Sequence, residues 1–301
     1  MKLGMIGLGR MGSNMAQRLA LGGHELCGFD PNPQAYTALK NNGVFLANSL
    51  ADLIASLPEP RTVWLMVPAG VITESTLAML SPLLVAGDSI IDGGNSNYKD
   101  TVRRAKALAV QGVHYLDCGT SGGVWGLTEG YSLMIGGNAT VVERLTPLFE
   151  TLAPAKDRGW GHVGPSGAGH FTKMIHNGIE YGLMQAYAEG FSILQHKADF
   201  TLDLHQIAEI WRHGSVVRSW LLDLTSVALA GNPAMTGIAP RVDDSGEGRW
   251  TVAEAIDLEV SAPVITMALL ERLRSRDPDS YTDKLLAAMR QQFGGHAVGT
   301  P

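Results

Sequence analysis

Cysteine, basic charge and long apolar runs are all scarce in this chain, and each scarcity excludes a class of protein. Its two cysteines, Cys27 and Cys118, fall in separate predicted strands, which argues against a disulfide framework. Aspartate and glutamate outnumber lysine and arginine by 29 to 23, so the basic surface that nucleic acid requires is missing. No apolar run reaches the ~18 residues that cross a membrane. We expect a cytoplasmic protein that binds neither nucleic acid nor membrane.

Glycine, by contrast, is plentiful, and its first cluster follows a short apolar run. Residues 2–6 read as a buried strand, residues 13–21 have helical periodicity, and between them stands Gly7-Leu8-Gly9-Arg10-Met11-Gly12. In this setting the three glycines allow a tight turn, the approach of a pyrophosphate, and close packing of helix on strand. We therefore expect residues 7–12 to bind a dinucleotide with its phosphates at the helix N-terminus.

Asp30 directly follows the second predicted strand, which runs from His24 to Phe29. A carboxylate at this place accepts hydrogen bonds from the ribose hydroxyls of NAD and repels the 2′-phosphate of NADP. Between Asp30 and Lys40 there is no lysine or arginine that would neutralise that phosphate. The sequence predicts NAD over NADP, although Asp30 also suits a helix N-cap ahead of Pro31.

Strand-like and helix-like segments alternate along the first half of the chain. The apolar runs are 62–67, 89–92, 113–117 and 132–135, and the helical stretches lie near 71–80, 98–110 and 141–152. This alternation indicates βαβ units and a largely parallel sheet. After Pro154 a Gly- and Pro-rich stretch leads into helical periodicity with no clear strand. We expect an α/β fold, with a Rossmann-type doubly wound sheet in residues 1–163 followed by an all-helical domain in residues 164–301.

Three polar loops follow predicted strands, at the edge where an open α/β sheet binds its ligands. They are Val67-Pro68-Ala69-Gly70, Asp92-Gly93-Gly94-Asn95-Ser96 and Gly119-Thr120-Ser121-Gly122-Gly123. Turn chemistry alone would explain any one of them. Together, with Asn95 and Ser121, they favour one crevice for a carboxylate or a hydroxyl-rich substrate.

A stripe of polar residues follows the glycine-rich stretch at 164–169. Helix neighbours fall three and four residues apart, so one side of a helix there would present Lys173, His176, Asn177, Glu180 and Tyr181. A solvated face is the ordinary explanation of lysine and glutamate. His, Asn and Tyr are poor helix formers, however, and the apolar neighbours favour a pocket with convergent polar groups.

Together these motifs resemble the β-hydroxyacid dehydrogenase superfamily, and within it the decarboxylating 6-phosphogluconate dehydrogenases. The likeness rests on the 7–12 fingerprint, the Gly-Gly-Asn-Ser and Thr-Ser-Gly-Gly loops and the Lys-Met-Ile-His-Asn-Gly-Ile-Glu-Tyr helix. It continues through Gly248-Arg249-Trp250-Thr251, Arg272 and the run from Arg290 to His296. The chain is shorter than the common form and resembles the short, NAD-linked branch.

The resemblance implies oxidative decarboxylation of 6-phosphogluconate to ribulose 5-phosphate and CO2 with reduction of NAD, and no metal. Lys173 would be the general base and later acid, and Glu180 the acid that protonates carbon, while His176 and Asn177 orient the reacting hydroxyl. Cofactor contacts beyond residues 7–12 and Asp30 would come from Val67, Pro68, Ala69 and Asn95. The sugar-acid end would be held by Asn95, Ser121, Gly122, Gly123, His176 and Asn177. The phosphate would be held by Tyr181, Arg249, Arg272, Arg290 and His296.

One departure from the family concerns the phosphate. The common form has a lysine and a threonine in the loop before Gly248, where this chain reads Asp243-Asp244-Ser245-Gly246-Glu247. Either Arg249 compensates for the lost contact or the loop is rearranged.

Two other functions stay open. A dehydrogenase of the 3-hydroxyisobutyrate or tartronate semialdehyde type shares the pattern from Gly164 to Asn177, but it would not need Glu180, Tyr181 or the C-terminal arginines. A non-catalytic nucleotide-binding scaffold would have no use for Lys173 with Glu180.

The C-terminal helical stretches predict self-association as a dimer or tetramer. Their apolar faces are larger than a short helical domain covers unaided. They comprise Val264, Met267, Ala268, Leu270, Leu273, Leu285, Leu286, Met289 and Phe293. By the resemblance, Arg290 and His296 would then serve the partner's substrate site.

Overall fold

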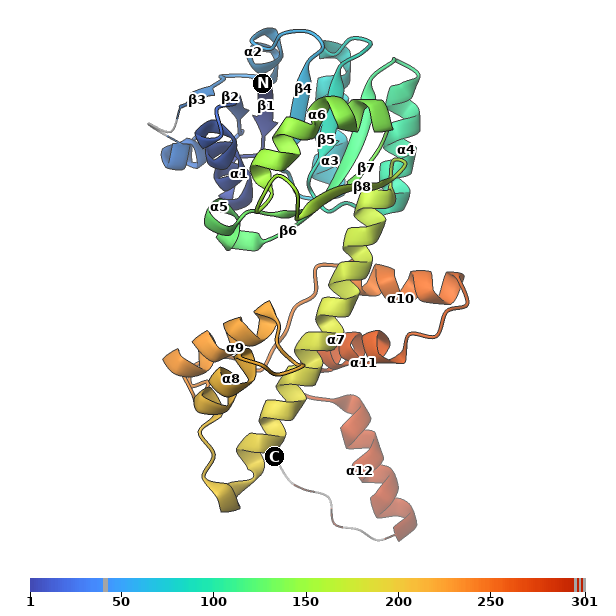
Figure 1. Ribbon diagram of the computed structural model, residues 1–301. Coiled ribbons are helices and arrows are strands. Elements are labelled where there is room, and N and C mark those ends of the chain that lie inside the picture. The colour runs from blue at the N-terminus through green and yellow to red at the C-terminus, as the bar shows by residue number, and fades with distance from the viewer. Residues whose placement is uncertain (40–42, 295–296, 298, 300–301) are drawn as a thin grey trace. The chain divides into compact units, whose positions relative to one another are not determined.

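The computed structural model describes residues 1–39, 43–294, 297 and 299. These form two compact units, Met1–His176 and Asn177–Pro301. The first is an α/β unit and the second is helical, as the ribbon in Figure 1 shows for each. None of the helices in the described part of the chain has the length and apolar character that a bilayer crossing needs.

The first unit is built on one eight-stranded sheet with the order β3-β2-β1-β4-β5-β6-β7-β8. Neighbouring strands pair in parallel, except that β6 and β7 are antiparallel. The strands are β1 (Lys2–Ile6), β2 (Glu25–Phe29), β3 (Val44–Leu46), β4 (Thr62–Leu65), β5 (Ser89–Asp92), β6 (His114–Ser121), β7 (Ser132–Gly136) and β8 (Trp160–Gly164). The prediction of a largely parallel sheet is confirmed.

Strand β8 corrects the expectation that no strand follows Pro154. It forms the edge of the sheet beside β7, and none of its five residues is buried. A half-exposed edge strand needs no apolar run, so its Gly- and Trp-containing sequence has no strand-like pattern.

Helices cover both faces of the sheet. Successive strand residues point to opposite faces, so each face forms an apolar core of its own with the helices that cover it. Ile91 belongs to the core that packs against α1 (Arg10–Leu21) and α6 (Ala139–Leu152). Ile90 belongs to the core under α2 (Leu50–Ala55), α3 (Val71–Leu80) and α4 (Tyr98–Ala109). Shorter helical turns are η1 (Pro33–Leu39), η2 (Ser81–Leu83), η3 (Gly123–Trp125) and α5 (Gly126–Glu129). This is the doubly wound arrangement that the sequence predicts.

The second unit contains no strand among its described residues. Its longest helix, α7 (Ala168–His196), begins within the first unit, so the division into units falls inside α7 and later than the predicted boundary at 163/164. Small cores form around Phe191 and around Tyr181. The remaining helices are η4 (Ala198–Phe200), α8 (Leu204–Arg212), α9 (Trp220–Gly231), α10 (Glu247–Asp257), α11 (Pro263–Arg274) and α12 (Tyr281–Gly294).

Candidate active site

The glycine fingerprint forms the turn between β1 and α1. Gly7 has a φ of +88°, and a Cβ on Gly12 would lie 1.9 Å from the Gly7 carbonyl oxygen, so both positions require glycine. Gly9 differs, because nothing lies within 4 Å of the place where its Cβ would stand. Gly9 is also the N-cap of α1 and provides no side-chain cap. Open space beside an uncapped helix N-terminus fits a pyrophosphate.

Asp30 stands at the end of β2 with its carboxylate fixed by backbone. The Leu8 N–H donates to Oδ2 and the Asn32 N–H donates to Oδ1, both at 2.8 Å. Each oxygen retains a lone pair with which it can accept a ribose hydroxyl. The sequence also allows Asp30 to act as a helix N-cap. At the start of the helical turn 33–39 it is instead Asn32 whose Oδ1 accepts a hydrogen bond from a backbone N–H, that of Gln34, at 3.1 Å.

The loop after β5 is organised by Asp92, which is fully buried. Its carboxylate accepts from the Gly94 N–H at 3.0 Å, the Ser96 hydroxyl at 2.8 Å and the Tyr115 hydroxyl at 2.7 Å. The guanidinium of Arg104 lies 3.4 Å away and supplies the opposite charge. Burial, and then Asp92, raise the pKa of Tyr115 well above its usual range, so this hydroxyl remains a donor.

Asn95 joins the loop after β5 to the end of β6, which extends to Ser121 and so includes the first residues of the predicted loop 119–123. Its backbone has a φ of +50°, and its amide bonds Thr120 twice, with Oδ1 accepting from the Thr120 N–H at 3.0 Å and Nδ2 donating to the Thr120 carbonyl at 3.3 Å. This contact brings the predicted ligand loops of Asn95 and Ser121 together. Asn95 retains one amide hydrogen and one oxygen lone pair for a ligand.

Lys173 is 5% exposed because the first turns of α7 pack directly on the sheet. A Cβ on Gly119 would lie 2.4 Å from Lys173 Cβ, and one on Gly169 would lie 2.4 Å from the Met134 carbonyl oxygen. Only glycine permits this approach of helix and strand. A lysine held there against backbone has few rotamers left, which suits a positioned base.

The start of α7 is capped by Asp117, a buried residue of β6. Its carboxylate accepts from the Gly167 N–H at 2.7 Å and the His170 N–H at 2.8 Å, where the helix dipole favours negative charge. The His170 ring bonds Thr101 at 2.7 Å and the Asp92 carbonyl at 3.0 Å, so this histidine is structural. Sequence reasoning assigned no role to the carboxylates of Asp92, which begins a predicted ligand loop, or of Asp117, although each ends an apolar run.

The Nζ of Lys173 lies 3.1 Å from Nδ1 of His176, one turn along α7. A neutral imidazole accepts from an ammonium, and a neutral amine accepts from an imidazole N–H, so the pair can share a proton in either state. Asn177 and Glu180 follow on the same helix and are half-buried. Among the described residues, no three His, Cys, Asp or Glu side chains are grouped to hold a metal.

Of the five predicted phosphate ligands, three contact the same loop of the second unit, residues 243–245. Tyr181 accepts from the Ser245 N–H at 3.4 Å, and the Arg272 guanidinium stacks 3.5 Å from the centroid of its ring. Arg249 pairs with Asp244 at 3.1 Å. Arg290 lies exposed on α12, and His296 lies outside the described residues.

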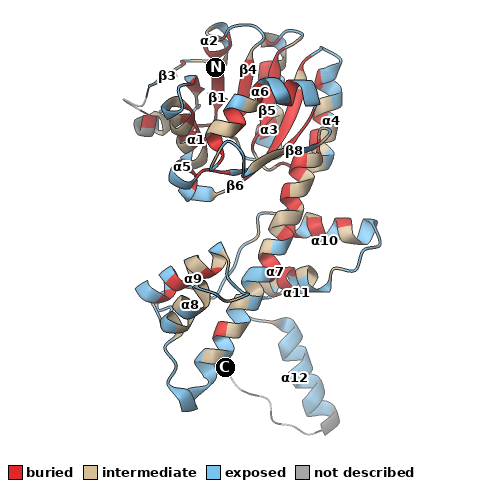
Figure 2. Cartoon of the chain, in the orientation of Figure 1, coloured by how far each residue is buried: buried red, intermediate tan, exposed pale blue. Residues whose placement is uncertain are grey.

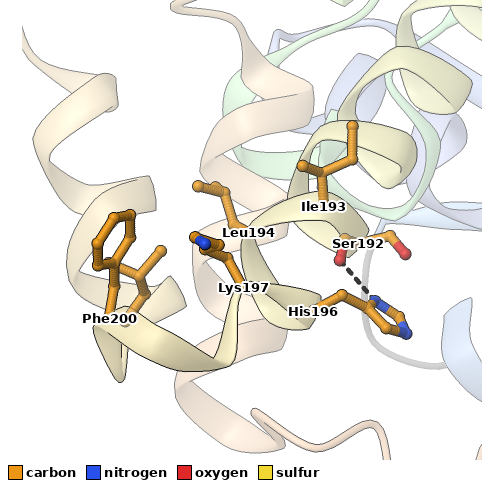
Figure 3. Close-up of a pocket in the computed structure, with 7 residues that line it drawn as sticks. Ser192, Ile193, Leu194, His196, Lys197 and Phe200 are labelled. Atoms are coloured by element: carbon orange, nitrogen blue, oxygen red, sulfur yellow. Dashed lines mark hydrogen bonds between the residues drawn. The ribbon is translucent and has the colours of Figure 1, made fainter.

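Two apolar hollows of the second unit are separate from the predicted site residues. Figure 3 shows one of about 440 Å³ at the end of α7, where the His196 ring bonds the Ser192 carbonyl at 2.8 Å. The other, of about 470 Å³, is lined by side chains such as Tyr187, Phe191 and Leu221. Neither contains a residue that the sequence predicts to bind cofactor or substrate.

Comparisons with known proteins match both the α/β and the helical part of the chain. The NAD binding domain of 6-phosphogluconate dehydrogenase matches residues 2–162, and the C-terminal domain of 6-phosphogluconate dehydrogenase matches residues 169–283. An NAD(+)-dependent, decarboxylating 6-phosphogluconate dehydrogenase of Haloferax volcanii is 44% identical over 299 residues, which are 99% of this chain and 98% of the relative.

Longer proteins match over part of their length. An NAD(+)-dependent, decarboxylating 6-phosphogluconate dehydrogenase of Bacillus subtilis is 38% identical over 91% of this chain and 61% of its own. The solved Plasmodium falciparum 6-phosphogluconate dehydrogenase, described with NADP+ and 6-phosphogluconate, has a TM-score of 0.86 at 26% identity and is matched over 66% of its chain. The present chain thus has an NAD(P)-binding domain and belongs to the 6-phosphogluconate dehydrogenase family of oxidoreductases.

Proposed function

We propose that this chain oxidises and decarboxylates 6-phosphogluconate to ribulose 5-phosphate and CO2, with NAD as oxidant. The observation that carries the proposal is Lys173, buried against Gly119 and hydrogen-bonded to His176 at 3.1 Å. Such a lysine is fixed in place and has a neighbour with which to exchange a proton. The relative from Haloferax volcanii, which matches over nearly its whole length, carries this activity in its name.

The first unit would hold the dinucleotide, which supplies one function, the uptake of a hydride. The open position at Gly9 and the N-terminus of α1 would receive the pyrophosphate, and Asp30 would receive the ribose hydroxyls. The loop residues Val67, Pro68, Ala69 and Asn95 would complete the contact.

Asp30 supports a preference for NAD over NADP. Its two backbone hydrogen bonds fix the carboxylate at the end of β2, where a 2′-phosphate would meet its charge. The relatives include both NAD(+)- and NADP+-linked enzymes, so this preference is a property of the individual chain rather than of the family.

Lys173 would remove the proton of the substrate hydroxyl as hydride leaves the same carbon. The resulting β-keto acid breaks its bond to the carboxylate and releases CO2, and the electron pair passes to the keto oxygen. Lys173, now an ammonium, would stabilise that oxygen as negative charge develops. Glu180 would then protonate the carbon that lost CO2, while His176 and Asn177 orient the reacting hydroxyl.

The remaining contacts would bind the two ends of the substrate. Hydrogen bonds suited to a hydroxyl-rich acid would come from Asn95, Ser121, Gly122 and Gly123. Tyr181, Arg249, Arg272, Arg290 and His296 would hold the phosphate, for which the planar fork of arginine is suited.

Self-association is supported by the surface of the last helices. Every side chain of α12 from Tyr281 to Gln292 is exposed, as its colour in Figure 2 shows. Apolar residues are among them, together with others on α11, namely Val264, Met267, Leu270, Leu285, Leu286 and Met289. A second copy of the chain would cover these faces and bring Arg290 to the partner's substrate.

The deciding experiment incubates the purified protein with NAD and 6-phosphogluconate and follows both NADH absorbance and release of CO2. We expect the two products in equal amounts. NADH without CO2, or turnover of 3-hydroxyisobutyrate or tartronate semialdehyde instead, would assign the chain to the non-decarboxylating dehydrogenases. A protein that binds NAD and turns over none of these substrates would contradict the proposal altogether.

A further inference from the structure

Three arginines converge on the loop before α10, where the family resemblance leaves the phosphate site incomplete. Arg249 belongs to α10, Arg272 belongs to α11, and Arg276 follows the C-cap of α11, Ser275. Arg272 donates to the Asp243 carbonyl at 3.0 Å, and Arg276 donates to the Val242 carbonyl at 3.2 Å. The Tyr181 hydroxyl meets the same loop at Ser245.

One carboxylate holds two of these guanidinium groups. Asp244, whose side chain is 5% exposed, accepts from Arg249 Nε and Nη2, each at 3.1 Å, and from Arg276 Nη2 at 2.6 Å. Hydrogen bonds from Arg249, then from Arg276, hold the pKa of Asp244 below its usual value. Asp244 is therefore a carboxylate at neutral pH, and it fixes both side chains in one orientation.

Arg249 and Arg276 each have a hydrogen-bond donor that Asp244 does not use. Nη1 of Arg249 and Nη1 of Arg276 have no hydrogen-bond partner within the described part of the chain. Two guanidinium groups share the single charge of Asp244, and they are 49% and 25% exposed. Planar donors with spare N–H groups and uncompensated charge form the kind of site that a phosphate monoester occupies.

Other acids near the cluster do not cancel this charge fully. Asp243 is 75% exposed and lies 3.6 Å from Arg276 Nε, where solvent screens it. The Glu247 carboxylate accepts a hydrogen bond from the Ser245 hydroxyl. The resemblance places a lysine and a threonine in this loop in the common family form, whereas here Glu247 and Ser245 bond each other.

We propose that Arg276 is a phosphate-binding residue of this chain, and that Asp244 is the positioning residue that holds Arg249 and Arg276 side by side for the substrate's phosphate. The assignment rests on the proposed function and deepens it. Arg276 takes over the phosphate contact that the lysine and threonine of this loop provide in the common family form. The competing explanation is that the Asp244 pairs only fasten the loop to the end of α11, where Val242 also donates to Ser275 at 2.9 Å.

Binding measurements on Arg276→Gln separate the two explanations. We expect the dissociation constant of 6-phosphogluconate to rise about ten- to hundred-fold, the scale of lost hydrogen bonds to a charged group, while that of unphosphorylated gluconate stays unchanged. Arg274→Gln is the matched control, since Arg274 carries the same charge two residues earlier, is exposed, and has no ion-pair partner among the described residues. An equal loss for both ligands would show that Arg276 only fastens the loop, and would overturn the proposal.

Asp244→Asn tests the positioning role. It keeps both arginines and an oxygen acceptor but removes the charge that holds them, so we expect weaker binding of 6-phosphogluconate and unchanged binding of NAD. Tighter binding would mean that Asp244 competes with the phosphate and would contradict the assignment. If the wild-type protein does not turn over 6-phosphogluconate, the proposed function fails; if it does and Arg276→Gln binds it as Arg274→Gln does, only this inference fails.

Discussion

Lys173 and His176 form a hydrogen-bonded pair one turn apart on α7, with Nζ 3.1 Å from Nδ1, and the sheet fixes one end of that pair. The backbone of Gly119 leaves no space between β6 and the Lys173 side chain. Asp117 in turn anchors the helix start through two N–H groups. The position of the proposed base is thus set by strand residues more than fifty positions earlier in the chain.

Replacement of the proposed base and of the proposed acid should impair different steps, hydride transfer in the first case and protonation of carbon in the second. We expect Lys173→Met to lower kcat by at least about 10²–10⁴-fold while NAD binding persists, because the proton acceptor is lost and the nucleotide site is intact. Glu180→Gln should impair release of the decarboxylated product more than NADH formation. Lys197→Met, a change at an exposed lysine beyond α7, serves as the control. Near-normal turnover of Lys173→Met would refute the base assignment.

The fingerprint glycines should respond differently to alanine. Gly12→Ala places a Cβ 1.9 Å from the Gly7 carbonyl oxygen and should lower the free energy of unfolding by about 1–3 kcal/mol. Gly9→Ala meets no atom within 4 Å and keeps an allowed φ of −60°, so the protein should stay stable but bind NAD more weakly. Thermal unfolding and NAD titration of both variants check this. Unaltered NAD affinity in Gly9→Ala would mean that the pyrophosphate does not approach there.

Cofactor choice should depend on Asp30. Asp30→Ala with Pro31→Arg removes the repulsion and adds a partner for the 2′-phosphate, which should shift preference toward NADP by ~1–3 kcal/mol. Position 31 is preferable to 32 because Asn32 caps η1 through Gln34. The ratio of kcat/KM for the two cofactors measures the shift, with the exposed Asp52→Ser as control. A wild-type protein that already prefers NADP would refute the role of Asp30.

Acid should loosen the loop before α10. The pKa of Asp244 lies below its usual value of 3.8, so its stabilising contribution is complete above that value and is lost as pH falls through the lower, folded-state pKa. Between about pH 5 and pH 2, Asp244→Asn should therefore show a flatter decline of unfolding free energy than the wild type. Parallel declines measured by chemical denaturation would mean that the Asp244 pairs add nothing to stability.

Local patterns were sufficient to predict the parts of the molecule that depend on neighbours in sequence. The fingerprint, strand β5 with its end at Asp92, and the polar side of α7 all follow from spacing within about ten residues. Strand β6 continues past its predicted end at Asp117 to Ser121. The pairing of Asp244 with Arg276 joins residues 32 positions apart, and an arginine on a helix looks the same whether it faces solvent or a buried carboxylate. The sequence of β8 has no strand-like apolar pattern, because none of the residues of this edge strand is buried.

One substrate site should draw on residues of two chains. Arg290 lies exposed on α12, and the apolar residues beside it, Leu285, Leu286 and Met289, are 44 to 50% exposed, as a helix that packs on a second copy would be. Lys173→Met and Arg290→Ala should each be nearly inactive alone. If Arg290 serves the partner's site, mixing the two variants creates hybrids with one site that has both residues intact, and activity returns. Kinetic assay after subunit exchange, verified by differently tagged chains, measures the recovery. Confirmed exchange without recovery would place Arg290 in the site of its own chain or outside any site.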